Sequence, residues 1–548
     1  MKYTIIELSG GIRETGKLSK NITLNRGKQF RMDEYRALVE GLLKSDKKGR
    51  ILVDCKSDFH PQFFAGLVIV RKELGRLKDC GYELHFYGRD FSPVQLYLAS
   101  VCNYRYINLC GTVSYLGLAR TFNFFKGTLD NNGIEIQVFR RGKYKSANDS
   151  FRLKKLDPAN REQWEAIFEA MERELKAGIL SGYGKEEGEI DVLLSGRMLS
   201  SAEAVNEAWA DEILTAGELE NRWKKEKLKK KKVKSGQTTY GSGSGIAVLH
   251  FEGGIMEGSS KQDPLMGQVL GTDSFLPEIK RLKKSRKVKG IVLRVNCPGG
   301  SPVASDEVAA ALEDLAEKKP LVVSMADVAG SGGYWISTLG RRIFTEAVTV
   351  TGSIGVVAMM IQAGKLMKRW GINQDSIKTG PLADMGSVGR AMTAGEKKIM
   401  DRRIESLYSI FVKRVARQRN SSEEAIDKIA QGRVWTGAEA VELGLADEIG
   451  GLSEAIDYLR SEIGTKSVKV NHYPEIKSSF IERQLTKATP GASMTFGSGV
   501  SAFLLNHLSS LLLKTRVSCD STESLSGKPL LFIPEFFWRD PGTSVNFD

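Results

Sequence analysis

The stretch LVVSMADVAGSGGYWISTLG occupies residues 321–340 and predicts the central turn of the fold. Its apolar run 321–326 is typical of a buried strand, and YWISTLG after Gly-Ser-Gly-Gly predicts a helix. Such a strand-to-helix turn holds the Ser331 hydroxyl at a helix N-terminus, where free N–H groups and the dipole favour a developing negative charge. Ser331 is therefore a candidate nucleophile, although no His or Asp pattern beside it offers a base.

The chain contains two diverged copies of one unit. Three pairs of segments match: YTIIELSGGI (3–12) with IAVLHFEGGI (246–255), RILVDCK (50–56) with GIVLRVN (290–296), and SGRMLSSAEAVNEAWADEI (195–213) with QGRVWTGAEAVELGLADEI (431–449). Small differences in offset between the pairs are what duplication followed by loop insertions and deletions produces. Two unrelated α/β domains would also share strands and glycines, but they would not repeat AEAV and ADEI at one offset.

Each copy carries a different part of the chemistry. The second copy has Ser331 where the first has Val94, and Gly299-Gly300 also belongs to the second copy. The first copy has Lys145, whose counterpart in the second is Ala383. Neither copy is complete alone, so we predict one site that draws on both.

A lysine can act as the base for a serine only when its amine is neutral. The reference pKa of a lysine, about 10.4, keeps it charged at pH 7, and burial lowers that pKa. Arg140, Arg141 and Lys143 would disfavour a charge on Lys145, whereas Asp149 would favour one if it were close. The sequence leaves this balance open.

Backbone groups near Ser331 are candidates for binding the substrate and its oxyanion. The N–H of Gly332 follows the serine, and Gly299-Gly300 allows close approach of bare backbone. Ser353, in VTGSIGV (350–356), is a candidate to orient the lysine amine. Each motif alone has a plain structural explanation as a turn, a loop or a helix cap. Their order, spacing and complementary distribution between the copies favour the catalytic interpretation.

The ordered motifs LRVNCPGG (293–300), DVAGSGGYW (327–335) and VTGSIGV (350–356), with YKSA (144–147) upstream, resemble the long, two-domain form of the signal peptide peptidase A (protease IV) family. The resemblance covers roughly residues 1–475. It implies an α/β fold of two tandem Clp-protease/crotonase-like domains built from strand-strand-helix units.

The resemblance also implies functional roles. Ser331 would be the nucleophile and Lys145 the general base, while Ser353 would contact the lysine. Gly299, Gly300 and Gly332 would hold the substrate and the oxyanion. The family implies a bowl-like homotetramer that degrades membrane-derived peptides, including apolar signal-peptide remnants.

Two features depart from the family pattern. Gly330 precedes the serine where many relatives have alanine, which is a conservative difference. Long relatives usually begin with a membrane-spanning helix, whereas this chain begins MKYTIIELSGG, a strand pattern. No signal peptide and no long apolar run appears, so we expect a cytoplasmic or peripheral, membrane-associated location.

The composition argues against other kinds of site. The six cysteines have no CxxC or CxxH spacing, so we expect neither a metal site nor a disulfide framework, and no cofactor. His85 and His250 lie in apolar strands and are expected in the core, which makes a Ser/His/Asp triad unlikely.

The charge pattern suggests the domain boundaries. We predict a lysine-supplying domain at residues 1–222, a linker at 223–245 that is basic and then Gly/Ser-rich, a serine-supplying domain at 246–475, and an extension at 476–548. The net charge is +14, and the run WKKEKLKKKKVK (223–234) is a solvated linker or the basic end of a helix, or else it attracts anionic lipid. Nucleic acid is not an expected partner, because no aromatic-interleaved basic motif accompanies the run.

Three function classes follow from these patterns. The first is a serine endopeptidase that uses a Ser331/Lys145 dyad. The second is a crotonase-type acyl-CoA enzyme, which would share the glycine-based oxyanion site but would not have a serine that inhibitors acylate. The third is a non-catalytic scaffold of the same fold.

Overall fold

The computed structural model describes residues 2–15, 29–61, 64–230, 243–263, 267–464 and 468–474, together with the backbone of Leu531–Phe532. Apart from that two-residue backbone, the predicted extension at 476–548 lies outside the described residues. Among the helices that are described, none combines the length and the apolar character needed to cross a bilayer.

The first half of the chain is built on a six-stranded parallel sheet with the order β10-β6-β5-β4-β1-β11. Its strands are β1 (Lys2–Leu8), β4 (Arg50–Cys55), β5 (Glu83–Gly88), β6 (Tyr104–Ile107), β10 (Glu212–Ile213) and β11 (Lys229–Lys230). Helices α1 (Met32–Leu43), α2 (Phe64–Asp79) and α3 (Pro93–Ala99) pack on it. The central strands β4 and β5 are buried at every residue after the first, as expected for strands covered on both faces.

The second half repeats this arrangement strand for strand. Its parallel core runs β23-β19-β18-β16-β12-β24, and β18 also pairs with β20, which pairs antiparallel with β22. These strands are β12 (Gly245–Glu252), β16 (Val288–Cys297), β18 (Leu321–Gly330), β19 (Ile343–Thr345), β20 (Val350–Gly352), β22 (Val434–Thr436), β23 (Glu448–Ile449) and β24 (Val470–Tyr473). The matching strand orders confirm two tandem α/β domains.

The remaining helices and strands surround these two sheets. In the first half they are β2 (Gly11–Arg13), β3 (Gln29–Arg31), β7 (Thr112–Val113), α4 (Lys126–Asn131), α5 (Asp149–Arg152), α7 (Glu187–Leu194), β9 (Leu199–Ser200), α8 (Ser201–Asn206) and α9 (Ala216–Lys225). In the second half they are β13 (Gly254–Met256), β14 (Lys261–Asp263), β15 (Gly267–Gly271), α10 (Thr272–Lys284), β17 (Gly299–Gly300), α11 (Pro302–Ala316), α12 (Gly332–Ser337), α13 (Gly364–Arg369), α15 (Glu423–Ile429), α16 (Gly437–Glu442) and α17 (Leu452–Glu462). A two-residue strand, β25 (Leu531–Phe532), pairs with β17.

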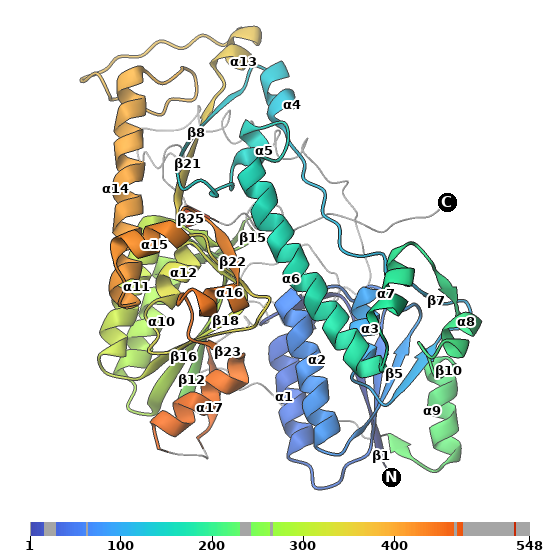
Figure 1. Ribbon diagram of the computed structural model, residues 1–548. Coiled ribbons are helices and arrows are strands. Elements are labelled where there is room, and N and C mark those ends of the chain that lie inside the picture. Colours follow the sequence, from blue (N-terminus) through green and yellow to red (C-terminus); the bar gives the residue numbers. More distant parts are fainter. Residues whose placement is uncertain are drawn as a thin grey trace, which may run out of the picture.

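Two elements of the first half reach across to the second (Figure 1). Strand β8 (Glu135–Arg141) pairs antiparallel with β21 (Val356–Gln362), with Arg141 opposite Val356. The long helix α6 (Pro158–Tyr183) buries Ile167 and Met171 against Val328 and Val350 of the second half. These contacts join the two copies into one body around the end of β18.

Apolar residues recur at helical spacing along residues 160–177 and 396–418, and these segments fall within α6 and α14 (Ala394–Gln418). The predicted linker differs from the structure at its start: residues 223–225 belong to α9, where Trp223 is buried, and β11 pairs with β1. Trp223 packs against Tyr3, so burial of this ring extends the first half to Lys230. His85 and His250 are buried in their strands, as expected.

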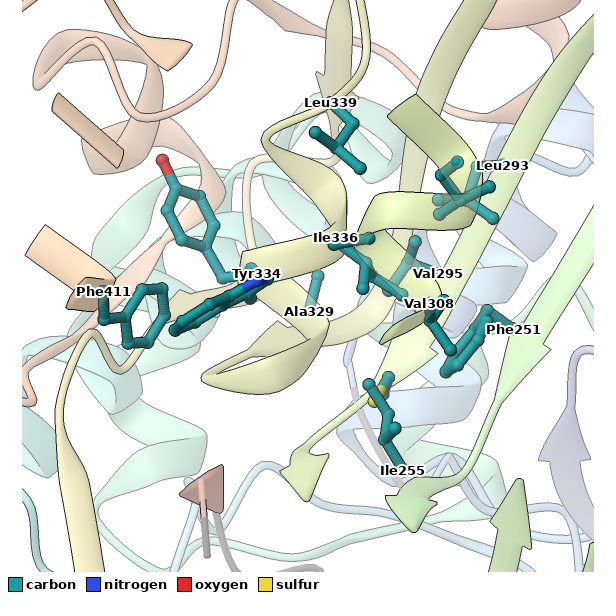
Figure 2. Packing of buried hydrophobic residues seen from close by; sticks show 14 of the residues in the cluster. Phe251, Ile255, Leu293, Val295, Val308, Ala329, Tyr334, Ile336, Leu339 and Phe411 are labelled. Carbon is teal, nitrogen blue, oxygen red and sulfur yellow. The ribbon is translucent and has the colours of Figure 1, made fainter. Parts of the chain in front are cut away.

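The core of the second half surrounds the short helix α12. Figure 2 shows the side chains of Tyr334, Ile336 and Leu339 directed into one apolar cluster with Leu293 and Phe411. Tyr334 is fully buried, and its hydroxyl donates to the carbonyl of Leu445 at 2.9 Å. This packing fixes the helix, and therefore the turn that carries Ser331.

Candidate active site

Ser331 lies at the junction of β18 and α12, which confirms the strand-to-helix turn predicted from the sequence. Its φ of +55° is unusual for a residue with a side chain and marks a strained turn held by its surroundings. The Ser331 N–H donates to the carbonyl of Gly352 at 2.8 Å, which ties the turn to the neighbouring strand. Its side chain makes no capping hydrogen bond to the helix, so the hydroxyl is available for another partner.

That partner is Lys145, which comes from the first half. Lys145 Nζ lies 2.7 Å from Ser331 Oγ, 2.8 Å from Ser353 Oγ and 2.9 Å from the Ser353 carbonyl oxygen. A neutral amine has two N–H donors and one lone pair. It can therefore donate to the two Ser353 oxygens while its lone pair accepts the Ser331 O–H.

Burial decides the charge of Lys145. The side chain is 2% exposed, and burial lowers the pKa of Lys145 well below its ordinary value. Asp149, which could have favoured a charge, is instead paired with Arg152 at 2.7 Å and Arg140 at 3.6 Å. The site thus favours the neutral amine that a general base requires.

The structure brings the three candidate glycines together next to Ser331. A Cβ atom added to Gly332 would lie 3.3 Å from Gly300 N and 3.4 Å from Gly299 Cα. Gly300 pairs with Ile255 of β13 and has a φ of +157°. A Cβ atom on it would lie 1.9 Å from the Ile255 carbonyl oxygen, so only glycine fits this close approach.

The strand β17 also shows how an extended chain can lie at the site. Gly299 is opposite Phe532 and Gly300 is opposite Leu531 in an antiparallel pairing with β25. The backbone of Gly299–Gly300 therefore offers an edge that takes up a further strand, as in other cases of peptide recognition by strand addition.

The sequence interpretation missed a third segment at the site, the turn Gln431-Gly432-Arg433 (the 431–433 turn). The Gln431 carbonyl accepts from Tyr144 N at 2.8 Å, and the Arg433 carbonyl accepts from Ser353 N at 2.7 Å. The turn therefore contacts both the lysine segment and the backbone of Ser353. The available signal was the glycine shared by QGR (431–433) and SGR (195–197), which the sequence shows as part of the repeat.

The donors gathered here are hydroxyl, amine and backbone groups, which do not form a metal-binding set. Within the described ranges, His, Cys, Asp and Glu side chains form no group of three or more that could hold a metal ion.

Comparison with known proteins places the chain among peptidases. The model of Peptidase family S49 matches residues 83–230 and 313–466, which together make up more than half of the chain. Protease 4 of Salmonella typhi is 33% identical over 406 residues, which cover 71% of this chain and 65% of that protein. The chloroplastic serine protease SPPA of Arabidopsis thaliana is 31% identical over 409 residues, covering 71% of this chain and 59% of that protein.

Shorter and more distant proteins also match. A putative signal peptide peptidase SppA of Enterococcus faecium is 31% identical over 228 residues, covering 41% of this chain and 66% of that protein. Among solved structures, a ClpP1 variant from Listeria monocytogenes aligns over 38% of this chain and 94% of its own at 17% identity, but the TM-score of 0.25 is too low to carry an argument. The alignments span less than two thirds of the first two relatives. The family match in both halves is decisive: the chain belongs to Peptidase family S49.

Proposed function

We propose that this chain is a serine endopeptidase in which Ser331 is the nucleophile and Lys145 the general base. The observation that carries the proposal is the 2.7 Å separation of Lys145 Nζ and Ser331 Oγ in a buried site. Serine is a weak nucleophile until a neighbouring base takes its proton, and a buried lysine of lowered pKa is such a base.

In the first step, the lone pair of Lys145 Nζ takes the proton of Ser331 Oγ as the oxygen attacks the peptide carbonyl carbon. The carbonyl oxygen becomes an oxyanion. The N–H of Gly332 stands at the first position of α12, where no preceding turn supplies an intrahelical acceptor, and is suited to donate to that oxyanion. The Ser353 oxygens hold the lysine ammonium that forms.

In the second step, the ammonium of Lys145 gives its proton to the leaving amine as the C–N bond breaks. The acyl group stays on Ser331 Oγ. The neutral amine then removes a proton from water, and the resulting hydroxide equivalent attacks the ester. Collapse of that intermediate releases the carboxylic acid product and returns the proton to Ser331.

The substrate class is also part of the proposal: extended peptides derived from membranes, including apolar signal-peptide remnants. The pairing of β25 with Gly299–Gly300 supports binding of an extended backbone. The name of one relative, a putative signal peptide peptidase of Enterococcus faecium, supports the substrate class.

Assembly and location complete the proposal. We propose a homotetramer that shields the site, and peripheral contact with anionic membrane through basic residues such as those at 223–230. Light scattering measures the first, and co-sedimentation with vesicles containing anionic lipid measures the second. A monomer at the concentration used in the activity assay would contradict the homotetramer. Equal binding of the protein to anionic and neutral vesicles would contradict the contact with anionic membrane.

The dyad is tested with Ser331→Ala and Lys145→Ala in a peptide hydrolysis assay. Each substitution should lower kcat about 10³-fold or more, because a group that makes or breaks the bond is lost. Lys143→Ala is the control: Lys143 is exposed two positions away, so this variant should hydrolyse peptide like the original protein. Near-normal turnover of Lys145→Ala would refute the assignment of the base.

Labelling by a fluorophosphonate separates the endopeptidase from the two alternatives. The endopeptidase should be modified at Ser331, and Ser331→Ala should not be modified at that position. A crotonase-type acyl-CoA enzyme would turn over a thioester without labelling at Ser331. A scaffold would show neither labelling nor turnover.

A further inference from the structure

We infer that Gly432 is a positioning residue for the dyad, because the missing side chain lets the lysine segment of the first half lie directly against the 431–433 turn. This inference rests on the proposed function, since the dyad is what Gly432 would position. It assigns to the glycine a part in setting the distance between the amine and the two serine hydroxyls.

The 431–433 turn lies between the two segments that meet at the site. On one side, the Gln431 carbonyl accepts from Tyr144 N at 2.8 Å, one residue before the lysine. On the other side, the Arg433 carbonyl accepts from Ser353 N at 2.7 Å, and Gly432 N donates to the Ile354 carbonyl at 2.8 Å. One short turn thus binds the backbone next to the base and the backbone of the residue that orients it.

The contact with Lys145 leaves no room for a side chain. A Cβ atom on Gly432 would lie 2.6 Å from Lys145 Cβ, 2.7 Å from Lys145 N and 2.9 Å from Lys145 Cα. These are backbone atoms and the first side-chain atom, which cannot move without moving the amine. The same junction needs Gly142, whose Cβ atom would lie 2.5 Å from the Gln431 carbonyl carbon.

The turn is itself anchored from behind. Tyr408 of α14 accepts from Gln431 N at 3.3 Å and from Gln431 Nε2 at 3.1 Å through its hydroxyl, and donates to Asp427 Oδ1 at 2.5 Å. Arg433 donates to Glu162 of α6 at 2.7 Å. Elements of both halves therefore hold the turn against the dyad.

The duplication supplies a matched control. Gly196 is the counterpart of Gly432 in the first copy and also has a positive φ, +102° against +73°. A Cβ atom on Gly196 would meet nothing within 4 Å. Alanine at either position carries the backbone strain of a left-handed conformation, but only alanine at 432 meets the lysine.

The experiment compares Gly432→Ala with Gly196→Ala in the full chain, measuring kcat, KM and the pH profile of kcat/KM. Gly432→Ala should lower kcat about 100-fold, because displacement by about 1 Å can cost that much. It should also move the acidic limb of the profile to higher pH. A displaced amine is more exposed to water, and this exposure raises the pKa of Lys145. Gly196→Ala should keep the original kcat and profile. Equal losses in the two variants, or an unchanged profile in Gly432→Ala, would overturn the inference.

Tyr408→Phe also tests whether the 431–433 turn positions the Lys145 amine, and it adds no atoms to the turn. This variant provides the test if Gly432→Ala does not fold. Loss of the hydroxyl frees Gln431 from its anchor, so kcat should fall several-fold and the acidic limb should shift in the same direction. An unchanged kcat and profile would count against the inference. Failure of the proposed function has a different signature: the original protein would show no hydrolysis that depends on Ser331.

Discussion

Arg294, on the central strand β16 of the second half, is paired with Glu14 of the first half in a contact buried from solvent. Arg294 Nη2 lies 2.6 Å from Glu14 Oε1, and the two side chains are 0% and 3% exposed. Arg36 pairs with the same carboxylate at 2.9 Å, and these two guanidinium groups lower the pKa of Glu14 against the opposing effect of burial. The pair joins the two copies away from the dyad, in the part of the interface that also contains Thr15, Glu252 and Asp327.

Arg294→Met should destabilise the fold by about 3–5 kcal/mol, because removing one partner leaves a buried carboxylate with less compensation. The arginine also donates to Ser324 Oγ at 2.8 Å, and that bond is lost as well. Arg341→Met is the control, since Arg341 pairs with Glu462 while 54% exposed and should contribute at most about 1 kcal/mol. Urea unfolding of both variants measures the difference, and equal midpoints would contradict it.

Ser353→Ala should lower kcat about tenfold to a hundredfold and leave KM nearly unchanged, because Ser353 Oγ orients the amine 2.8 Å away. The loss is smaller than that of Lys145→Ala, since the Ser353 carbonyl oxygen remains 2.9 Å from Nζ. Ser337→Ala is the control: that hydroxyl is also buried but donates to the Gly333 carbonyl within α12. Steady-state kinetics decide, and a normal kcat for Ser353→Ala would show that the carbonyl alone suffices.

The activity should rise with pH along a limb that lies well below the ordinary titration range of lysine, about 10.4. The direction follows from the base: burial lowers the pKa of Lys145, and only the neutral amine can take the proton of Ser331. The measurement is the pH dependence of kcat/KM with an uncharged peptide. An acidic limb centred near pH 10 would mean that the amine is hydrated in solution.

Asp327→Asn should make the fold more stable above pH 7 by about 1–3 kcal/mol and change little below about pH 4, the usual pKa of an aspartate. Burial, and then the charge of Glu14, raise the pKa of Asp327 to about 7. A carboxyl with a raised folded pKa contributes stability that is complete at low pH and is lost as the pH rises toward that value. Asparagine stays neutral and can still accept from Gly66 N, which lies 2.6 Å from Asp327 Oδ1.

Thermal unfolding at about pH 4 and pH 8 tests this prediction, because these values lie on either side of the window between the usual aspartate pKa and the raised one. Glu252 provides an internal comparison, because burial raises its pKa to about 7 as well and its effect has the same sign. The variant should therefore keep part of the pH dependence. A melting temperature lowered equally at both pH values would contradict the prediction. It would show that burial of the asparagine amide, rather than removal of the carboxylate charge, determines the change in stability.

Much of the fold could be read from local patterns. The apolar run at 321–326 predicts a buried strand, and the repeat predicts two related domains, whose parallel sheets have matching strand orders in the structure. The predicted start of the linker, residue 223, lies within the folded first half. Trp223 stands next to a run of lysines that is typical of an exposed segment, and its burial depends on a contact with Tyr3, which is distant in sequence. Burial of a single ring in a charged segment leaves no periodic signal.

The part of the candidate site that could be predicted consists of residues whose side-chain type and motif indicate a chemical role. Ser331 in its glycine turn, Lys145 in the other copy and Ser353 were identifiable, and the structure places Lys145 Nζ 2.7 Å from Ser331 Oγ and 2.8 Å from Ser353 Oγ. The roles that we assign to them remain proposals. Gly432 was not identifiable as part of the site, because a glycine that is needed for close packing looks like any other turn glycine until its neighbour is known.

Local sequence patterns are enough to identify the two copies, the strand-to-helix turn, and the presence of Ser331 in one copy and Lys145 in the other. The folding of the whole chain brings these two residues together across 186 positions and buries both of them. Secondary structure follows from local patterns of apolar and turn residues. The pKa of a lysine, in contrast, depends on which distant segments exclude water from it.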